Sequence, residues 1–454
     1  MKKVVVNRRS FLKGAAVAGA GFAFPTIVPS TVFGANAPSN RLEMAAIGIG
    51  GMGIGNLREF LRRKDIQVVA ACDVDKNHLN RAVKMANDSN KNSDCRGYGD
   101  FRELFATEKL DTVMLALPDQ WHALVAVASA RAGCDIYGEK PLARSIKEGR
   151  AICDAVQRYN RVWQTGSWQR SRSNFHQACQ LVRNGRIGKV AHVEVSLPNA
   201  RGPRAVQSPQ PEPSHLDWNM WLGPAPWRPY AAFGSKGIHF DWRWILDFSG
   251  GQLTDWAGHH IDIAHWALDM DTTGPVSIEG SADYPINSQY DVPNSFQFKC
   301  IYADGLVIDV ASKPKRNIRF HGENGKWIDV WRGGIRASDP AILREQMGPG
   351  DDPLYTSRDH HGNFVDCVKN RKLTITPVET AHRSISVGLL GEIAMMTGRK
   401  IRWNPETEEI IGDSSASALL GVRIVNRGFC RKSFLCRSAK RNYGGRGKTE
   451  RLKS

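Results

Sequence analysis

The sequence of 454 residues lacks a C-x-x-C pair, an internal repeat and any long apolar run after residue 35. A membrane-spanning helix needs about 20 consecutive apolar residues, so none is expected beyond the N-terminal segment. There are nine cysteines, an odd number, and several lie in apolar segments. Disulfide frameworks use an even set of cysteines. We therefore predict mainly buried thiols.

Acidic residues are nearly absent from both ends of the chain. Residues 1–41 contain six lysines and arginines and no acid, whereas residues 423–454 contain eleven and a single acid. These ends carry +6 and +10 of the total charge of +17, which leaves +1 for residues 42–422. The positive charge therefore predicts no nucleic-acid partner for the folded body. Residues 421–454 have few apolar residues and no helical stripe, so we expect a disordered basic tail there.

The N-terminal charge belongs to a targeting motif. Residues 7–13 read NRRSFLK, a twin-arginine export signal, and a weakly apolar run follows over residues 14–28. The glycines and alanines of this run make it too weakly apolar for a transmembrane span. We expect a signal peptide over residues 1–37, interaction with the twin-arginine export machinery, and a periplasmic or exported protein. Because this pathway carries folded proteins, a tightly held cofactor would be bound before export.

A glycine-rich turn at residues 48–53 reads GIGGMG and follows an apolar run, residues 41–47, that predicts a strand. Such glycines let a strand turn tightly into a helix and let backbone approach a pyrophosphate. Asp73 follows the next predicted strand, residues 66–72, and lies 20 residues past the last glycine. Its carboxylate suits a free ribose 2′-OH, so the pattern predicts NAD more than NADP; the alternative is a turn that binds nothing. The predicted cofactor contacts here are Gly48, Gly50, Gly51, Met52, Gly53 and Asp73.

The spacing of apolar residues divides the chain into two domains. Residues 40–165 alternate strands and helices, which indicates an α/β Rossmann domain with a doubly wound parallel sheet. Residues 166–420 change to longer strands, with hairpin signals Asp-Gly at 304–305 and Asn-Gly at 324–325. We expect a C-terminal α+β domain with a mostly antiparallel sheet. Residues 218–244, rich in Trp and Pro, predict a long surface loop.

A basic residue follows a predicted strand at the expected ligand crevice. Lys140, in the segment Glu139-Lys140-Pro141, comes directly after residues 135–138. Ligands of open α/β sheets bind at the carboxyl ends of the strands, where a lysine can bind a substrate hydroxyl and stabilise an alkoxide. The alternative is a surface Lys–Glu pair. Arg170, just past the domain junction, either reaches into the crevice toward substrate or forms a surface ion pair.

A second candidate cluster lies on a predicted helix over residues 250–262. Asp255 and His259 share one face of it at i, i+4. A carboxylate beside an imidazole orients it, which suits a general acid–base that takes a proton from a hydroxyl. His260 is a candidate substrate contact or an ordinary polar residue. Zinc held by Asp255, His259, His260 and Asp262 is a further alternative. Because consecutive histidines point to different helix faces, we predict no metal site.

Together these motifs resemble the glucose–fructose oxidoreductase / inositol dehydrogenase / MocA family over about residues 42–420. The motifs are the glycine turn, residues 117–123 (LPDQWHA), residues 139–141 (EKP), residues 221–224 (WLGP) and the Asp255-x-x-x-His259 helix. The resemblance implies a Rossmann domain followed by an α/β substrate domain whose open antiparallel sheet supports homo-oligomerisation.

The resemblance also implies roles for individual residues. It assigns Lys140 as the catalytic lysine, Asp255 as its acidic partner and His259 as the acid–base. It further implies a cis peptide bond before Pro141. Within the motifs at residues 117–123 and 139–141, the residues expected to line the cofactor are Pro118, Trp121, His122 and Glu139.

The leading interpretation is an exported NAD(P)-dependent oxidoreductase that moves hydride between nicotinamide and a C–OH or C=O of a sugar, glycoside or cyclitol. Two alternatives stay open. An NAD-dependent glycosidase would oxidise a sugar transiently, eliminate the aglycone and reduce the product again with similar crevice residues. A non-catalytic sugar sensor would keep the fold, although Lys140, Asp255 and His259 are all present.

Overall fold

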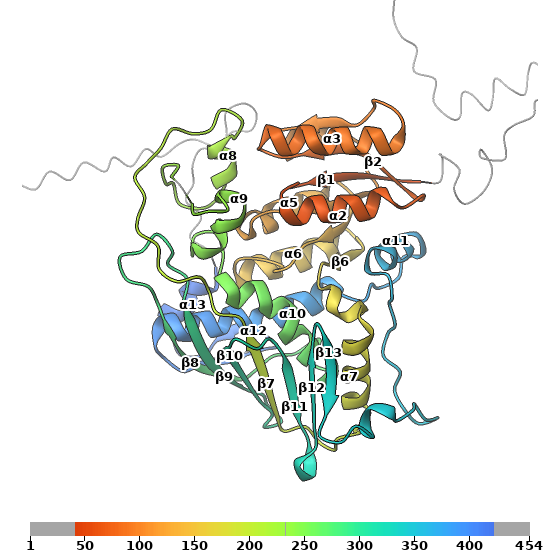
Figure 1. The fold of residues 1–454 in the computed structure, drawn as a ribbon, viewed down its shortest axis with the longest axis vertical. Helices are drawn as coiled ribbons and strands as arrows, with labels where there is room; N and C mark the ends of the chain where they lie inside the picture. Colours follow the sequence, from red (N-terminus) through yellow and green to blue (C-terminus); the bar gives the residue numbers. More distant parts are fainter. Residues whose placement is uncertain (1–40, 232, 422–454) are drawn as a thin grey trace, which may run out of the picture. The chain divides into compact units, whose positions relative to one another are not determined.

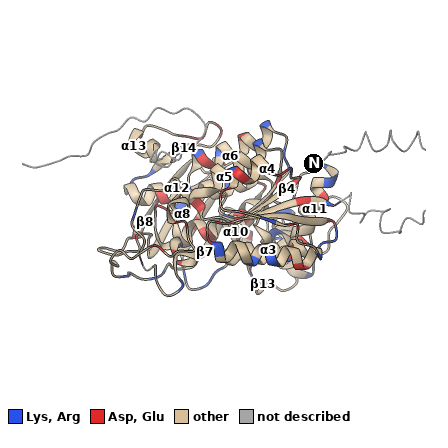
Figure 2. Ribbon diagram, turned by 90° about the horizontal axis from the view of Figure 1, so that it is seen from above, with Lys and Arg blue, Asp and Glu red and all other residues tan. Residues whose placement is uncertain are grey.

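The fold is seen in a computed structural model that describes residues 41–231 and 233–421 (Figure 1). The predicted signal peptide, and residues 422–454 of the predicted basic tail, lie outside the described residues. No helix within the described ranges is long and apolar enough to cross a membrane. Acidic and basic residues are interspersed along the described ribbon (Figure 2), in keeping with the small net charge of this part.

The first sheet has six strands, and all neighbouring pairs are parallel. Its order, β3-β2-β1-β4-β5-β6, is that of a doubly wound dinucleotide-binding fold, as predicted. The strands are β1 (Leu42–Ile47), β2 (Ile66–Cys72), β3 (Arg96–Tyr98), β4 (Thr112–Leu115), β5 (Asp135–Gly138) and β6 (Trp163–Thr165). The helices that accompany them are α2 (Gly51–Leu61), α3 (Lys76–Asn90), α4 (Phe101–Thr107), α5 (Asp119–Arg131) and α6 (Ile146–Arg158). Every residue of β4 and β5 is buried, because helices cover both faces of this sheet.

The second sheet has nine strands in the order β13-β12-β11-β7-β10-β9-β8-β14-β15. Its pairs are antiparallel except for β7 with β10, which is parallel. The strands are β7 (His192–Leu197), β8 (Ser277–Asp283), β9 (Ser295–Ile301), β10 (Val307–Ser312), β11 (Ile318–His321), β12 (Trp327–Trp331), β13 (Gly334–Ala337), β14 (Ile401–Asn404) and β15 (Glu409–Ile410). Both predicted hairpins, β9–β10 and β11–β12, are present. The prediction of a mostly antiparallel second sheet is therefore confirmed.

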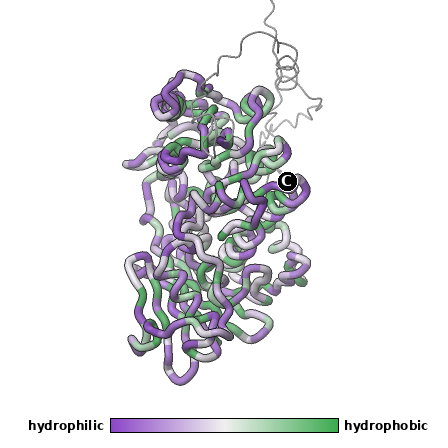
Figure 3. Tube along the Cα trace, turned by 90° about the vertical axis from the view of Figure 1, so that its right-hand side faces the viewer, coloured by the Kyte–Doolittle hydropathy of each residue, from purple (hydrophilic) through white to green (hydrophobic). Residues whose placement is uncertain are grey.

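Helices cover one face of the nine-stranded sheet. Two long helices, α10 (Gly251–Leu268) and α12 (Val378–Thr397), pack against it, and α7 (Ser173–Arg183) lies beside α10 (Figure 1). Residues of β9 alternate between exposed and buried, with Phe298 facing α12. Hydrophilic and hydrophobic residues are accordingly interspersed along this part of the chain (Figure 3). On β8 and β9, several side chains of the opposite face are exposed.

After β13 the chain returns to the first sheet. Helix α11 (His360–Asn370) places Phe364 at 6.1 Å from the ring of Phe60 and 5.9 Å from that of Tyr137. Helix α11 therefore belongs to the core of the first sheet. A separate apolar core contains residues of both sheets and joins them. A short helix, α13 (Ser414–Ser417), is the last α-helix of the described residues.

The prediction of a surface loop over residues 218–244 is correct only in part. The short helices α8 (Trp218–Leu222) and α9 (Ile238–Asp241) lie near its two ends, and a buried cluster includes Trp218, Trp221, Phe233 and Trp242, whereas Trp227 is exposed. Trp218 stacks on Trp221 with ring centroids 5.1 Å apart. Burying such large rings outweighs the turn-forming tendency of the prolines between them.

The cysteine prediction is confirmed for the described part of the chain, where seven cysteines are free and buried. Cys430 and Cys436 lie outside the described residues.

Candidate active site

Close contacts explain two glycines of the turn between β1 and α2. Gly48 has a φ of +79°, and a Cβ there would lie 2.6 Å from the carbonyl oxygen of Ala116. A Cβ on Gly53 would lie 2.0 Å from the carbonyl oxygen of Gly48. By contrast, a Cβ on Gly51 would meet no atom of the described chain within 4 Å. The turn thus presents open backbone at the N-terminus of α2, which is the geometry that fits a dinucleotide pyrophosphate.

Asp73 is tied to this turn. Its Oδ2 accepts a hydrogen bond from the backbone N–H of Ile49 at 2.7 Å, and its Oδ1 accepts one from Asp75 at 2.9 Å. The hydrogen bond from His78 to Asp73 raises the pKa of this histidine. The carboxylate therefore lies beside the glycine backbone, where a ribose attached to a bound pyrophosphate would lie.

A cavity of about 1120 Å³, including its open mouth, lies against the turn. The predicted cofactor contacts that line it are Gly48, Gly50, Gly51, Met52, Asp73, Pro118, Trp121 and Glu139. Gly53 and His122 are outside this lining. The ring nitrogens of His122 lie 2.6 Å and 2.8 Å from the carbonyl oxygens of Pro141 and Leu117, so this histidine supports the segments that line the cavity.

Residues of the second domain cover the cavity. The backbone N–H of Lys76 donates to the carbonyl of His215 at 2.8 Å, and that of Asp217 donates to the carbonyl of Val74 at 3.1 Å. His239 Nε2 lies 2.9 Å from Asp75 Oδ2. The remaining covering residues are Met220, Trp221, Trp242 and Arg243. A dinucleotide in the cavity would therefore be enclosed between the Rossmann turn and residues 215–231 and 233–243, which we call the strap.

Lys140 and Asp255 meet at the edge of the cavity. Lys140 Nζ donates to Asp255 Oδ1 at 2.6 Å and to the Asp255 carbonyl at 3.2 Å. Arg243 Nε lies 3.8 Å from the same carboxylate. Burial acts to raise the pKa of Asp255, but the positive charges of Lys140 and Arg243 outweigh it and hold the pKa below its usual value. The peptide bond between Lys140 and Pro141 is cis.

His259 lies one turn further along α10 and is buried. Its Nδ1 is buried and has no hydrogen-bond partner in the described part of the chain. Burial, together with the positive charges of Lys140 and Arg332, lowers the pKa of His259 well below its usual value. A neutral imidazole one helical turn from the carboxylate that binds Lys140 can take a proton from a hydroxyl. The carboxylate of Asp255 accepts a hydrogen bond from Lys140, and the structure records none between this carboxylate and His259 among the described residues.

Two predicted substrate contacts lie elsewhere. Arg170 is 2% exposed and forms ion pairs with Asp262 at 2.8 Å and Asp271 at 2.7 Å. These two carboxylates satisfy the guanidinium group of Arg170. The residue therefore links the segment after β6 to α10 and does not reach toward a ligand. His260 is fully buried, with Nδ1 at 3.2 Å from the Ser196 carbonyl. Neither residue lines the cavity, and His259 is outside this lining as well. Arg170 and His260 are set apart because their polar atoms are held by these protein partners.

Two cavity residues escaped the sequence reasoning. Asp119 lines the cavity directly after Pro118, and its position in the LPDQWHA motif was a usable signal. Burial raises the pKa of Asp119 to about 6. Arg243 had no such signal, because it lies in the strap, whose path across the cavity is a tertiary feature.

The fold and the cavity define a two-domain oxidoreductase with a dinucleotide-binding Rossmann domain. The sequence matches the oxidoreductase family, NAD-binding Rossmann fold, over residues 42–167 and the oxidoreductase family, C-terminal alpha/beta domain, over residues 199–427. The chain belongs to the Gfo/Idh/MocA oxidoreductase family, which confirms the resemblance. Residues 5–25 match the twin-arginine translocation signal, which directs export by that pathway, as predicted.

Curated relatives match part of the chain. A glycosyl hydrolase family 109 protein of Shewanella putrefaciens is 26% identical over 213 residues, which cover 42% of this chain and 46% of that protein. A glycosyl hydrolase family 109 protein of Stenotrophomonas maltophilia is 27% identical over 229 residues, which cover 49% and 48%. The chain spans about half the length of these curated relatives.

Solved structures share the fold. Myo-inositol 2-dehydrogenase from Lactobacillus plantarum superposes with a TM-score of 0.57 at 17% identity, covering 80% of this chain and 99% of that one. The WlbA dehydrogenase from Bordetella pertussis, solved with NADH and UDP-GlcNAcA, has a TM-score of 0.59 at 14% identity and the same coverage.

Proposed function

We propose that the protein is an exported NAD-dependent oxidoreductase that acts on a C–OH or C=O group of a sugar, glycoside or cyclitol. The observation that carries this proposal is the Lys140–Asp255 ion pair, with His259 one helical turn away, at the edge of a cavity that starts at the glycine turn. When bound, the nicotinamide group supplies the hydride acceptor or donor.

Each of these side chains has a definable part in the reaction. Lys140 Nζ, held by Asp255, donates a hydrogen bond to the reacting oxygen and stabilises the negative charge that develops there. His259 takes the hydroxyl proton in oxidation and returns it in reduction. Its lowered pKa keeps it neutral, and so able to accept, at neutral pH. Asp255 positions the ammonium group rather than the imidazole.

We further propose NAD over NADP, with slow exchange. Asp73 supports this preference, because its carboxylate would repel a 2′-phosphate. The basic residues His78 and Arg81 lie close to the same turn, so the affinities for NAD and NADP should both be measured. The strap encloses the cavity, which favours retention of a nucleotide loaded before export. In this proposal residues 40–165 bind the nucleotide, and residues 166–420 bind the substrate and, through the open sheet face, a second copy of the chain.

The similarity to glycosyl hydrolase family 109 proteins favours one further candidate, an NAD-dependent glycosidase. The same residues would oxidise a sugar hydroxyl, permit elimination of the aglycone and then allow re-reduction. Net chemistry would be hydrolysis, and the nucleotide would be regenerated within each cycle.

The deciding experiment is to purify the exported protein, denature it and identify the released nucleotide by mass spectrometry. A panel of sugars and chromogenic aryl glycosides is then offered to the holoprotein. We expect NAD and turnover that falls about 10²- to 10⁴-fold in Lys140→Ala and His259→Ala, the usual contribution of such groups. Lys400→Ala, at an exposed position, serves as the control.

The outcomes separate the candidates. Net NADH formation supports the oxidoreductase, whereas aglycone release without net NADH supports the glycosidase. Full turnover by both variants contradicts the catalytic assignment, and a protein that neither holds nor binds a dinucleotide contradicts the whole proposal.

A further inference from the structure

Arg332, in the turn between β12 and β13, has a guanidinium group held by three side chains. Its Cζ lies 4.1 Å from the ring centroid of Trp256 and 4.7 Å from that of Trp168. With its amide oriented to satisfy both ends, Gln169 accepts a hydrogen bond from Arg332 Nε at 3.0 Å and donates one to the His259 carbonyl at 3.1 Å. Stacking and this hydrogen bond together fix the plane of the guanidinium.

Arg332 is one of four cations on two neighbouring loops of the sheet. The others, between β10 and β11, are Lys313, Lys315 and Arg316. The two lysines each have a carboxylate oxygen nearby, at 3.5 Å and 3.8 Å. Within residues 41–231 and 233–421, neither Arg316 nor Arg332 has a carboxylate oxygen within 4.0 Å. Arg316 also stacks on Trp256, at 5.0 Å, so the two cations without an acid share one aromatic platform.

This platform borders the proposed reaction centre. Trp168 and Trp256 contact the ring of His259 edge-on, with centroids 5.9 Å and 6.1 Å away. The Arg332 side chain is exposed, so a ligand can reach it. The acid that acts on Arg332 at longer range, Asp255, is already paired with Lys140. A substrate beside His259 therefore meets positive charge that the described residues do not neutralise.

We propose that Arg332, assisted by Arg316, binds a carboxylate of the substrate, which makes the substrate a uronic acid or its glycoside rather than a neutral sugar. This inference rests on the proposed function, because it takes the sugar to lie beside His259. The planar guanidinium fork matches a carboxylate bidentately, and a fixed fork loses little entropy on binding.

The test compares matched substrates with the holoprotein. We would measure kcat/KM for D-glucuronate against D-glucose and D-galacturonate against D-galactose, and the p-nitrophenyl glycosides of the same four. The expected preference is for the acid of each pair. Arg332→Ala should lower the acid-to-neutral ratio about 10- to 100-fold, the usual range for a hydrogen bond to a charged group. Arg332→Lys should restore part of it, and Arg131→Ala, an exposed arginine of α5, should leave it unchanged.

A binding measurement keeps the inference separate from turnover. Quenching of tryptophan fluorescence by D-glucuronate is titrated in the Lys140→Ala holoprotein, with and without Arg332→Ala. Arg332-dependent binding of glucuronate without turnover of any sugar supports the carboxylate site and counts against the proposed function alone. Turnover of neutral sugars with an acid-to-neutral ratio that Arg332→Ala leaves unmoved overturns this inference and leaves the proposed function standing. A stronger Arg332-dependent response to glucose 6-sulfate or glucose 6-phosphate than to glucuronate overturns the assignment to a carboxylate.

Discussion

At the scale of single residues, Asp119 is a buried carboxyl group of the cavity with an incomplete set of partners. It begins α5, it is buried, and its Oδ2 has no hydrogen-bond partner within the described chain. Burial is the main cause that raises its pKa to about 6, although His122 and a hydrogen bond from Ser249 act in the opposite direction. An ionised carboxylate here lowers the stability of the folded protein. Such a cost occurs at functional sites, where a bound ligand can donate the hydrogen bond that Oδ2 lacks.

Asp119→Asn should therefore stabilise the protein in a pH-dependent way. The pKa of Asp119 in the folded protein lies above its unfolded value of about 4. The ionised carboxylate therefore lowers the free energy of unfolding as the pH rises through this interval, and the full loss is reached above it. We expect a gain of up to about 3 kcal/mol at pH 8 and almost none at pH 4, measured by urea unfolding. Asp366→Asn, at an exposed position of α11, is the control. An equal effect at both pH values would contradict this account.

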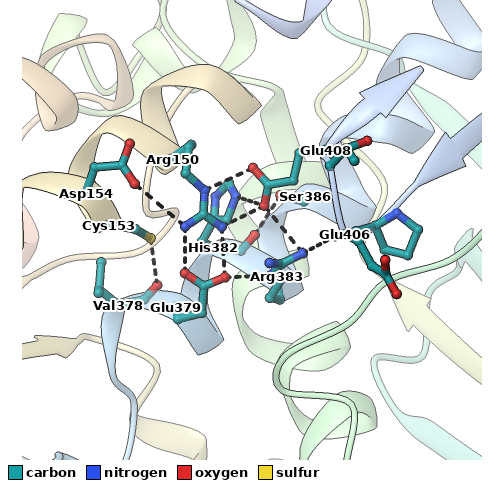
Figure 4. A network of polar contacts seen from close by, with 12 residues as sticks. Arg150, Cys153, Asp154, Val378, Glu379, His382, Arg383, Ser386, Glu406 and Glu408 are labelled. Carbon is teal, nitrogen blue, oxygen red and sulfur yellow. Dashed lines mark hydrogen bonds and ion pairs between the residues drawn. The ribbon is translucent and has the colours of Figure 1, made fainter. Parts of the chain in front are cut away.

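At the scale of elements, a network of charges joins α6 to α12 and to the turn before β15 (Figure 4). Arg150 binds both oxygens of Glu379 at 2.8 Å, and both oxygens of Glu408 at 3.0 and 2.7 Å. Arg383 and His382 bind the same two carboxylates. Burial acts to raise the pKa of both glutamates, but these partners lower each to about 2. The network thus ties the Rossmann domain to the helix that covers the second sheet.

Removing Arg150 should weaken the protein at neutral pH and less at acid pH. Because the folded pKa values lie below the unfolded ones, the stabilisation is present above about pH 4.5 and is lost as pH falls toward 2. Arg150→Met should cost about 1–3 kcal/mol at pH 7, a range reduced because Arg150 and Glu379 are partly exposed. We would measure the free energy of unfolding in urea at pH 7 and at pH 3, with Arg131→Met as the control. A loss that is independent of pH would point to lost packing instead.

At the scale of the whole molecule, the two domains meet over the cavity. The strap contacts the Rossmann domain through Val74–Lys76, and His239 adds a side-chain contact to Asp75 at 2.9 Å. Asp75 also caps α3 by accepting from the N–H of Asn77 at 2.8 Å. The contact from His239 can therefore be removed without loss of the cap, whereas a change of Asp75 would remove both.

His239→Ala should loosen the strap and speed loss of the bound nucleotide. We expect dissociation about 10-fold faster, the effect of losing one hydrogen bond to a charged group, with little change in thermal stability. The rate is followed by NADH fluorescence after dilution of the reduced holoprotein, and His321→Ala on the second sheet is the control. Unchanged dissociation would show that the strap does not limit nucleotide release.

The sequence by itself determined the local parts of this protein. The glycine turn, the strand alternation of the first domain and both hairpins depend on sterics and periodicity within a few residues, and each is present. The placement of Asp73 beside the turn follows from parallel strand order, which the alternation already implied.

Only the tertiary structure decided which distant residues meet. Lys140 and Asp255 are 115 positions apart, and Arg170 finds Asp262 at a separation of 92. The sequence left Arg170 equally suited to the crevice or an ion pair, and packing chose the ion pair. The strap and the arginines on Trp256 likewise depend on how two sheets pack, because side-chain partners across domains are selected by burial and charge balance that no local pattern contains.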